Sequence, residues 1–185
     1  MNINKILSRY HKYLGNKEKY YYKYAVAEAK QMGVKVGEGC RFFSTNFSSE
    51  PYLITIGNNV TITVGVRFIT HDGGMWTVRK ARPEYEYANI VGKIVIGDNV
   101  FVGMDSLLLP GISIGDNSIV AAGSVVTKSF PSNSVIGGNP ARLITDLDTY
   151  IDRNKNLYVN TLNLSEDKKN EYIKKEVHNI PFRKK

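Results

Sequence analysis

An aliphatic residue recurs at every sixth position over residues 90–126. The recurring positions are Ile90, Ile96, Val102, Leu108, Ile114, Val120 and Val126. A small or branched residue follows four places later, at Val100, Ser106, Ile112, Ser118 and Ser124. This period fits neither an α-helix nor a simple alternating strand, and it is typical of hexapeptide β-helix repeats. The pattern therefore predicts a parallel β-helix whose aliphatic positions stack in an inward column.

The same spacing can be followed toward the N-terminus, with two interruptions. Earlier positions in the pattern are Val36, Phe42, Ile56, Ile62 and Phe68. The spacing breaks over residues 44–52, which are rich in Ser and Asn, and again from residue 70 to about 89. Insertions in a repeat protein leave at corners and often carry binding residues. The sequence thus predicts a β-helix domain over residues 34–144 with an insertion loop at about 70–89.

Both ends of the chain have a helical pattern in place of hexads. Residues 1–33 predict a helical cap in which Asn16 begins a second helix and Gly33 ends it. Residues 145–185 predict an extension with a final helix that begins after Ser165. The expected fold class is an all-β core flanked by helical segments.

Composition limits the class of protein, the cellular compartment and the partners that we expect. A hydrophobic fraction of 42% and a charged fraction of 23% are those of an ordinary soluble domain. The sequence has no long apolar run and no secretory pattern at its start, so we expect no membrane-spanning segment. Cys40 is the single cysteine, which excludes an internal disulfide and favours the cytoplasm. The net charge of +8 lies largely in the two ends, and without a nucleic-acid-binding module we expect no nucleic-acid partner.

One of the three histidines stands out as a candidate catalytic residue. His11 and His178 fall in the predicted terminal helices, whereas His71 lies three residues after Phe68, where the large insertion begins. Histidine is the side chain best suited to accept a proton near neutral pH. His71 is therefore the candidate general base.

Residues 95–144 also resemble a known family. The segments AAGSVVTK (121–128) and GGNPAR (137–142) are similar to those of the hexapeptide-repeat acyltransferases, including the maltose and galactoside O-acetyltransferases and the sugar O-acetyltransferases of polysaccharide assembly. The resemblance implies a left-handed coil, a homotrimer with active sites between subunits, and acetyl-CoA as the donor. It implies no metal.

The resemblance also implies roles for individual residues. Met104 would offer a backbone N–H to acetyl-CoA, and Ala122 would contact the pantetheine arm. Thr127, Lys128 and Arg142 would bind the nucleotide end and its phosphates, which suits the charge of Lys and Arg. These five residues are the predicted donor site.

The predicted reaction is direct acetyl transfer to a hydroxyl of a saccharide, with His71 as the base and no acyl-enzyme. Asn46 matches an acceptor-contacting asparagine of the sugar enzymes, and the insertion has aromatic and charged residues suited to sugar rings and hydroxyls. The predicted acceptor-binding residues are Asn46, Asp72, Trp76, Arg79 and Tyr85.

Other functions compete with this prediction. The acceptor could be the nitrogen of an amino sugar or the hydroxyl of an antibiotic, and the sequence discriminates these poorly. A zinc carbonic anhydrase built on the same coil needs three histidines at one metal, but only His71 lies in the predicted coil domain. A purely structural β-helix would need neither the insertion beginning at His71 nor the basic residues Lys128 and Arg142.

Overall fold

The computed structural model describes residues 24–179. The chain divides into two compact units, Met1–Leu147 and Asp148–Lys185, and each is described by itself. The helix predicted before residue 24 lies outside the described residues. Within residues 24–179, no helix is both long and apolar enough to span a lipid bilayer.

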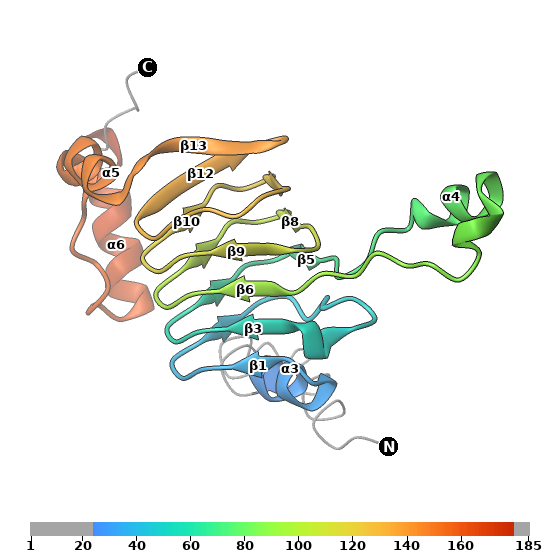
Figure 1. Ribbon diagram of the computed structural model, residues 1–185. Helices are drawn as coiled ribbons and strands as arrows, with labels where there is room; N and C mark the ends of the chain where they lie inside the picture. The colour runs from blue at the N-terminus through green and yellow to red at the C-terminus, as the bar shows by residue number, and fades with distance from the viewer. Residues whose placement is uncertain (1–23, 180–185) are drawn as a thin grey trace. The chain divides into compact units, whose positions relative to one another are not determined.

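The first unit is built on three sheets (Figure 1). The four-stranded sheet contains β1 (Lys35–Val36), β3 (Ile54–Ile56), β6 (Ile94–Ile96) and β9 (Ile112–Ile114). The six-stranded sheet contains β2 (Arg41–Phe42), β4 (Thr61–Ile62), β7 (Phe101–Val102), β10 (Ile119–Val120), β12 (Ser134–Gly138) and β13 (Ala141–Asp146). The three-stranded sheet contains β5 (Arg67–Phe68), β8 (Leu107–Leu108) and β11 (Val125–Val126).

From β3 to β11 the chain visits the three sheets in turn, and neighbouring strands within each sheet are parallel. We call this part of the molecule the coil. Only the last pair, β12 with β13, is antiparallel among the pairs of named strands. The parallel, β-rich core expected from the hexads is therefore confirmed.

Strand register explains the hexad pattern. Each paired residue lies three hexads along the chain from its partner, in the pairs Ile96–Ile114, Val102–Val120 and Leu108–Val126. All six side chains are at most 1% exposed. The residues two places before them, including Val100, Ser106 and Ser118, are buried as well. The period of six arises because each strand and its corner occupy one hexad.

The prediction that Ile90 belongs to this column is wrong. Its side chain is 50% exposed, and its carbonyl oxygen accepts a hydrogen bond from the backbone N–H of Asp72. The adjacent Val91 forms an antiparallel bridge with His71. Ile90 has the right spacing but lies on the return path of the insertion, and the coil resumes with β6.

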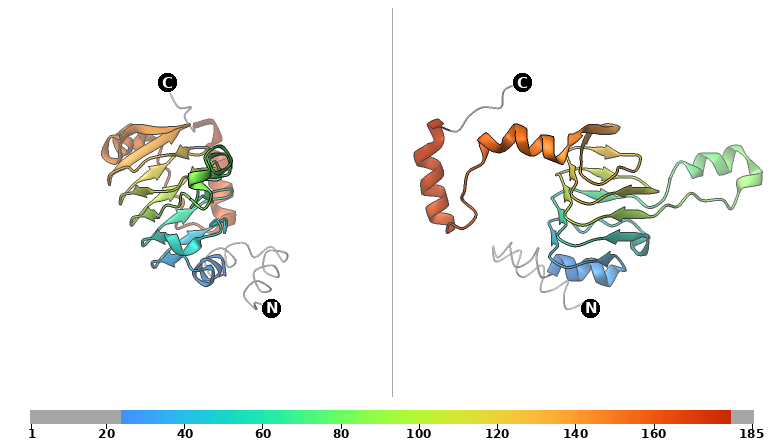
Figure 2. Two further views of the ribbon diagram at one scale, coloured as in Figure 1. Left: turned by 45° about the vertical axis from the view of Figure 1, so that its right-hand side comes forward. Right: turned by 60° about the vertical axis from the view of Figure 1, so that its left-hand side comes forward.

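The insertion forms an arm, here defined as residues 72–91, that stands off the coil (Figures 1 and 2). It contains α4 (Met75–Ala81) and the short 3₁₀ helix η3 (Pro83–Tyr85), where the sequence predicted a loop. The Asp72 carboxylate accepts a hydrogen bond from Gly74 N at 2.7 Å just before α4 begins. The Arg79 guanidinium donates to the carbonyl of Ala88 at 2.8 Å, which ties the outgoing and returning segments together.

The first break in the hexad pattern is only partly a loop. Asn46 forms a parallel bridge with Arg67, and Phe47 is 1% exposed, so this segment rejoins the core where the sequence predicted a looped-out segment. The Phe47 ring lies 5.7 Å from Phe42 and 5.1 Å from Phe68, centroid to centroid. A 3₁₀ helix, η2 (Pro51–Leu53), then leads into β3. This aromatic packing fixes residues 46–50 against the corner that follows β5.

Helices flank the coil in sequence. α3 (Val26–Met32) ends at Gly33, whose φ of 105° is accessible to glycine at low cost, as predicted. In the second unit, α6 (Glu166–Glu176) begins after Ser165, whose hydroxyl accepts from Lys168 N, and this prediction is also confirmed. α5 (Leu147–Asn154) was not predicted. Two further 3₁₀ helices among the described residues are η4 (Lys155–Leu157) and η5 (Val177–Asn179).

Gly103 shows why small residues recur at the corners. A Cβ at this buried position would lie 2.5 Å from Ala122 N and 2.7 Å from the oxygen of Val120, and both are backbone atoms. We expect Gly103→Ala to lower the free energy of unfolding by about 1–3 kcal/mol through overpacking. The matched control is Gly73→Ala, because no heavy atom lies within 4 Å of its added Cβ. Urea denaturation at one protein concentration measures both, and equal stability of the two variants would contradict this explanation.

Candidate active site

His71 lies where the arm leaves the coil. It follows β5, and its backbone forms the antiparallel bridge with Val91 at the base of the arm. Two further hydrogen bonds flank this bridge, from Asp72 N to Ile90 O at 3.0 Å and from Gly92 N to Thr70 O at 2.8 Å. The backbone of His71 is therefore held by both the coil and the returning strand of the arm.

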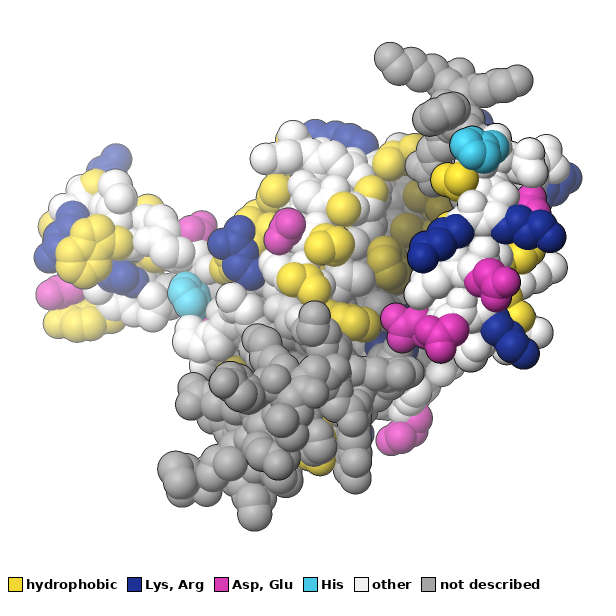
Figure 3. All heavy atoms as spheres, turned by 180° about the vertical axis from the view of Figure 1, so that it is seen from behind, with side chains coloured by type: hydrophobic (Ala, Val, Ile, Leu, Met, Phe, Trp, Pro, Cys, Tyr) yellow, Lys and Arg dark blue, Asp and Glu magenta, His cyan; other side chains and the backbone are white. Residues whose placement is uncertain are grey.

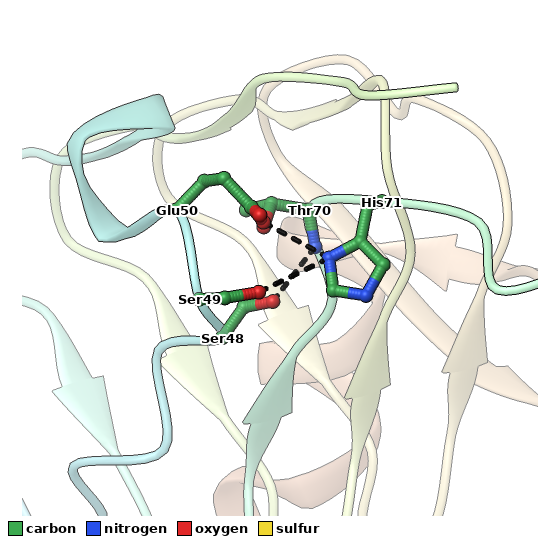
Figure 4. Close-up of polar contacts among 5 residues, drawn as sticks. All are labelled: Ser48, Ser49, Glu50, Thr70 and His71. Carbon is green, nitrogen blue, oxygen red and sulfur yellow. Dashed lines mark hydrogen bonds and ion pairs between the residues drawn. The ribbon is translucent and has the colours of Figure 1, made fainter. Parts of the chain in front are cut away.

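The imidazole of His71 contacts the carboxylate of Glu50 (Figure 4). Its Nδ1 lies 2.9 Å from Oε2 of Glu50 and 3.3 Å from the hydroxyl oxygen of Ser49. The Thr70 hydroxyl donates to the same Oε2 of Glu50 at 2.6 Å. Ser49 and Glu50 come from the segment just before β3, so two separate parts of the chain build this cluster.

Hydrogen bonds keep Glu50 ionised. The bond from Thr70, followed by the contact with His71, lowers the pKa of Glu50 from 4.5 to about 2. An ionised carboxylate can only accept hydrogen bonds, so Nδ1 of His71 carries the hydrogen in this contact. Neutral His71 then has its lone pair on Nε2, and the ring is partly exposed. The arrangement can take a proton from a bound hydroxyl at Nε2 and stabilise the resulting imidazolium.

Glu50 was missed by the sequence reasoning, which assigned Asp72, the carboxylate next to His71 in the chain, to acceptor binding. The Asp72 carboxylate instead accepts from Gly74 N and shapes the start of the arm. Glu50 lies 21 residues before His71, which is near the length of one coil. This separation in sequence was the only feature that could have indicated their contact. A coil places such residues side by side, but the break in the hexads at residues 44–52 hid the register.

A polar cavity of about 500 Å³ that is widely open to solvent lies next to this cluster. Its lining residues are Met32, Ser44, Thr45, Asn46, Phe47 and Ser48. It adjoins the cluster through Ser48, whose hydroxyl oxygen accepts a hydrogen bond from Thr70 N at 3.3 Å. The predicted acceptor residue Asn46 is thus on the wall of this cavity, and the lining side chains are uncharged.

The predicted donor residues occupy two edges of the coil. Thr127 and Lys128 follow β11, at the same edge as His71, which follows β5 of the same sheet. Met104 and Ala122 follow β7 and β10 of the six-stranded sheet, and their corners are joined by a hydrogen bond from Gly123 N to Met104 O. Within one chain, therefore, the structure does not bring these two groups together.

Arg142 and Lys128 are both exposed cations. Arg142 lies in β13 opposite Gly137, in the hairpin that closes the six-stranded sheet. The ammonium of Lys128 lies 5.5 Å from the ring centroid of Phe130. The guanidinium of Arg142 donates to the carbonyl oxygen of Ala141 at 3.0 Å, and both cations are accessible from solvent.

Of the predicted acceptor residues of the arm, Trp76, Arg79 and Tyr85 lie on α4 and η3, at its far end, whereas Asp72 lies before α4 (Figure 2). Trp76 is 66% exposed with the Lys80 ammonium 5.4 Å from its ring centroid, and Tyr85 is also exposed. Figure 3 shows hydrophobic and basic side chains together on the surface of the arm. Arg79 differs, because its guanidinium is engaged by Ala88 and Asn89 within the arm. Across residues 24–179, no three His, Cys, Asp or Glu side chains form a metal-binding group.

Comparisons with known proteins identify relatives of this chain. Residues 93–128 match the family described as the hexapeptide repeat of succinyl-transferase. Protein CapG of Staphylococcus aureus is 51% identical over 124 residues, which cover 65% of this chain and 70% of that protein. Galactoside O-acetyltransferase of Escherichia coli (strain K12) is 38% identical over 122 residues, which cover 64% of this chain and 56% of that protein.

A solved structure shares the fold. The crystal structure of a hexapeptide-repeat-containing acetyltransferase from Vibrio cholerae aligns with a TM-score of 0.55 and 23% sequence identity, covering 80% of this chain and 94% of that one. Among curated relatives, the chain spans about half the length of the galactoside O-acetyltransferase and of putative acetyltransferases from Bacillus subtilis (strain 168) and Schizosaccharomyces pombe.

Proposed function

The chain belongs to the hexapeptide-repeat acyltransferase family, and from this premise we propose that it transfers an acetyl group from acetyl-CoA to a hydroxyl of a saccharide. The resemblance inferred from the sequence is confirmed, and relatives that are named as acetyltransferases or putative acetyltransferases support the predicted enzyme class. The observation that carries the proposal is the pairing of His71 with Glu50 beside a polar cavity.

In the proposed mechanism, Nε2 of His71 takes the proton of the acceptor hydroxyl as its oxygen attacks the thioester carbonyl. The tetrahedral intermediate collapses with cleavage of the C–S bond, and the imidazolium returns its proton to the sulfur of CoA. Glu50 holds Nδ1–H throughout and stabilises the imidazolium. No acyl-enzyme forms. A backbone N–H such as that of Met104 stabilises the oxyanion.

The proposed active site is shared between copies of the chain. His71 and Lys128 lie on one edge of the coil and Met104 and Ala122 on another, so a second copy is needed to place the donor edge opposite His71. Phe101 and Met104 leave apolar surface exposed on the donor edge, which a neighbouring copy can cover. We propose the left-handed coil and the homotrimer that the family resemblance implies.

The proposed acceptor site is the cavity beside Ser48. Its hydroxyl and amide side chains, including Asn46, match the hydroxyl groups of a sugar. Trp76 and Tyr85 of an arm supply aromatic faces for sugar rings. Asp72 and Arg79, which the sequence also assigned to the acceptor, act in this proposal by holding the arm in shape.

The proposal is tested by the release of free CoA thiol from acetyl-CoA with a panel of acceptors. The panel contains free sugars, nucleotide sugars, amino sugars and chloramphenicol-like alcohols. We expect thiol release with a saccharide hydroxyl, and acetyl-CoA alone should raise the melting temperature by binding the native state. Failure of acetyl-CoA to stabilise the protein, with no release from any acceptor, would favour a structural β-helix.

Lys128→Ala and Arg142→Ala are expected to raise the KM for acetyl-CoA by about tenfold each, because a lost contact to a phosphate costs about one factor of ten in affinity. The kcat should stay within about twofold, since neither side chain contacts the reacting atoms. The matched control is Lys80→Ala on the arm, which should leave the KM for acetyl-CoA unchanged. Initial rates at varied acetyl-CoA measure all three, and an unchanged KM in both donor variants would contradict the donor site.

A further inference from the structure

Thr70 has a buried hydroxyl that contacts the proposed catalytic pair. Its side chain is 0% exposed, and its Oγ1 donates to Oε2 of Glu50 at 2.6 Å. The same oxygen of Glu50 contacts Nδ1 of His71 at 2.9 Å (Figure 4). One carboxylate oxygen therefore receives both the hydroxyl of Thr70 and the imidazole of the adjacent residue.

The backbone of Thr70 is fixed on both sides. Its N–H donates to the hydroxyl oxygen of Ser48 at 3.3 Å, and its carbonyl oxygen accepts from Gly92 N at 2.8 Å. The first bond joins it to the segment that carries Glu50, and the second joins it to the strand that returns from the arm. The position of the Thr70 hydroxyl is thus set by the coil and the arm together.

The backbone of Glu50 is also held, since its carbonyl oxygen accepts from Leu53 N at 3.0 Å, but this bond does not fix its carboxylate. Its side chain is longer, partly exposed, and free to rotate about three bonds unless something holds its carboxylate. The short bond from Thr70 restricts this freedom, together with the contacts of the carboxylate with His71 and Ser49. Consistent with this, the bond from Thr70 is the largest cause of the lowered pKa of Glu50.

We propose that Thr70 is a positioning residue that holds the Glu50 carboxylate against Nδ1 of His71 and thereby keeps the lone pair of neutral His71 on Nε2. This inference rests on the proposed acetyl transfer for its kinetic consequences. The effect of Thr70 on the tautomer of His71, which acts through Glu50, does not depend on which acceptor the protein uses. The kinetic effect and the tautomer of His71 can therefore be measured independently.

The kinetic test compares Thr70→Val, which replaces the hydroxyl by a methyl group, with Thr70→Ser, which keeps it. We expect Thr70→Val to lower kcat by about tenfold with an unchanged KM for acetyl-CoA, and Thr70→Ser to restore most of the rate. In the Glu50→Gln background, Thr70→Val should have little further effect, because its partner is already altered. An equal loss in both backgrounds would show a merely structural role and overturn the proposal.

The second test needs no acceptor. The ¹⁵N chemical shifts of the His71 imidazole report which nitrogen carries the hydrogen in the neutral ring. Wild type and Thr70→Ser should show the hydrogen on Nδ1, and Thr70→Val should show a mixture of both tautomers. Should Thr70→Val not fold, Thr70→Ala replaces it. An unchanged tautomer in the variant without the hydroxyl overturns the proposal, whereas absent turnover by the wild type counts against the acetyl transfer alone.

Discussion

His71→Ala is expected to lower kcat for acetyl transfer by about 10³-fold, the usual contribution of a positioned general base. His71 is the only described histidine in the coil, and its Nδ1 lies 2.9 Å from Oε2 of Glu50. The coil should be unaffected, because the imidazole is partly exposed and the strands on either side pair through their backbones. Steady-state rates of CoA release at saturating acetyl-CoA measure the effect.

The matched control is His178→Ala, which makes the same substitution at an exposed position of η5 in the second unit. This variant should keep the wild-type rate, and both variants should show the wild-type rise in melting temperature with acetyl-CoA. Equal rates for His71→Ala and wild type would remove His71 from the mechanism.

Glu50→Gln is expected to lower kcat by about 10²-fold. The amide has nearly the same shape as the carboxylate, but it has no charge to stabilise the imidazolium and can donate to Nδ1, which favours the wrong tautomer. The loss should appear in kcat, with the KM for acetyl-CoA unchanged. Glu84→Gln, at an exposed position of the arm, is the matched control. A Glu50→Gln variant as active as this control would show that His71 needs no carboxylate.

The same variant has a signature in the pH dependence of stability. The pKa of Glu50 is lowered in the folded protein, from 4.5 to about 2. Its contribution to stability is therefore fully present above the unfolded pKa of 4.5 and is lost as the pH falls toward about 2. The difference in free energy of unfolding between wild type and Glu50→Gln should shrink between pH 5 and pH 3, as measured in urea. A difference independent of pH over this range would contradict the lowered pKa.

The coil could be predicted because its geometry imposes a period on the sequence. Each inward side chain from Ile96 to Val126 stacks on the inward side chain of the neighbouring coil. Every sixth position must therefore be apolar, and the strand register can be predicted from the sequence. Ile90 was placed wrongly for the same reason, since spacing alone cannot show whether a residue lies in the coil or on a returning strand. The helix α4 was missed because its residues have only Met75 buried and thus no apolar stripe.

The candidate active site was only half predictable. His71 could be found because its residue type and its place at the start of the arm both point to proton transfer. Glu50 and Thr70 could not, since their roles depend on contacts between successive coils that the break at residues 44–52 obscures. The division of the donor residues between two edges also required the sheet order, because Ala122 and Lys128 are close in sequence but leave from different sheets.

The most direct test of the proposed function is a single-turnover experiment with labelled acetyl-CoA, excess protein and a saturating saccharide acceptor, quenched at successive times. Direct attack with His71 as the base predicts that the label passes from CoA to a sugar hydroxyl without ever being bound covalently to the protein. Labelled protein that forms and decays before the acetylated sugar appears, or label released only as free acetate, would contradict it.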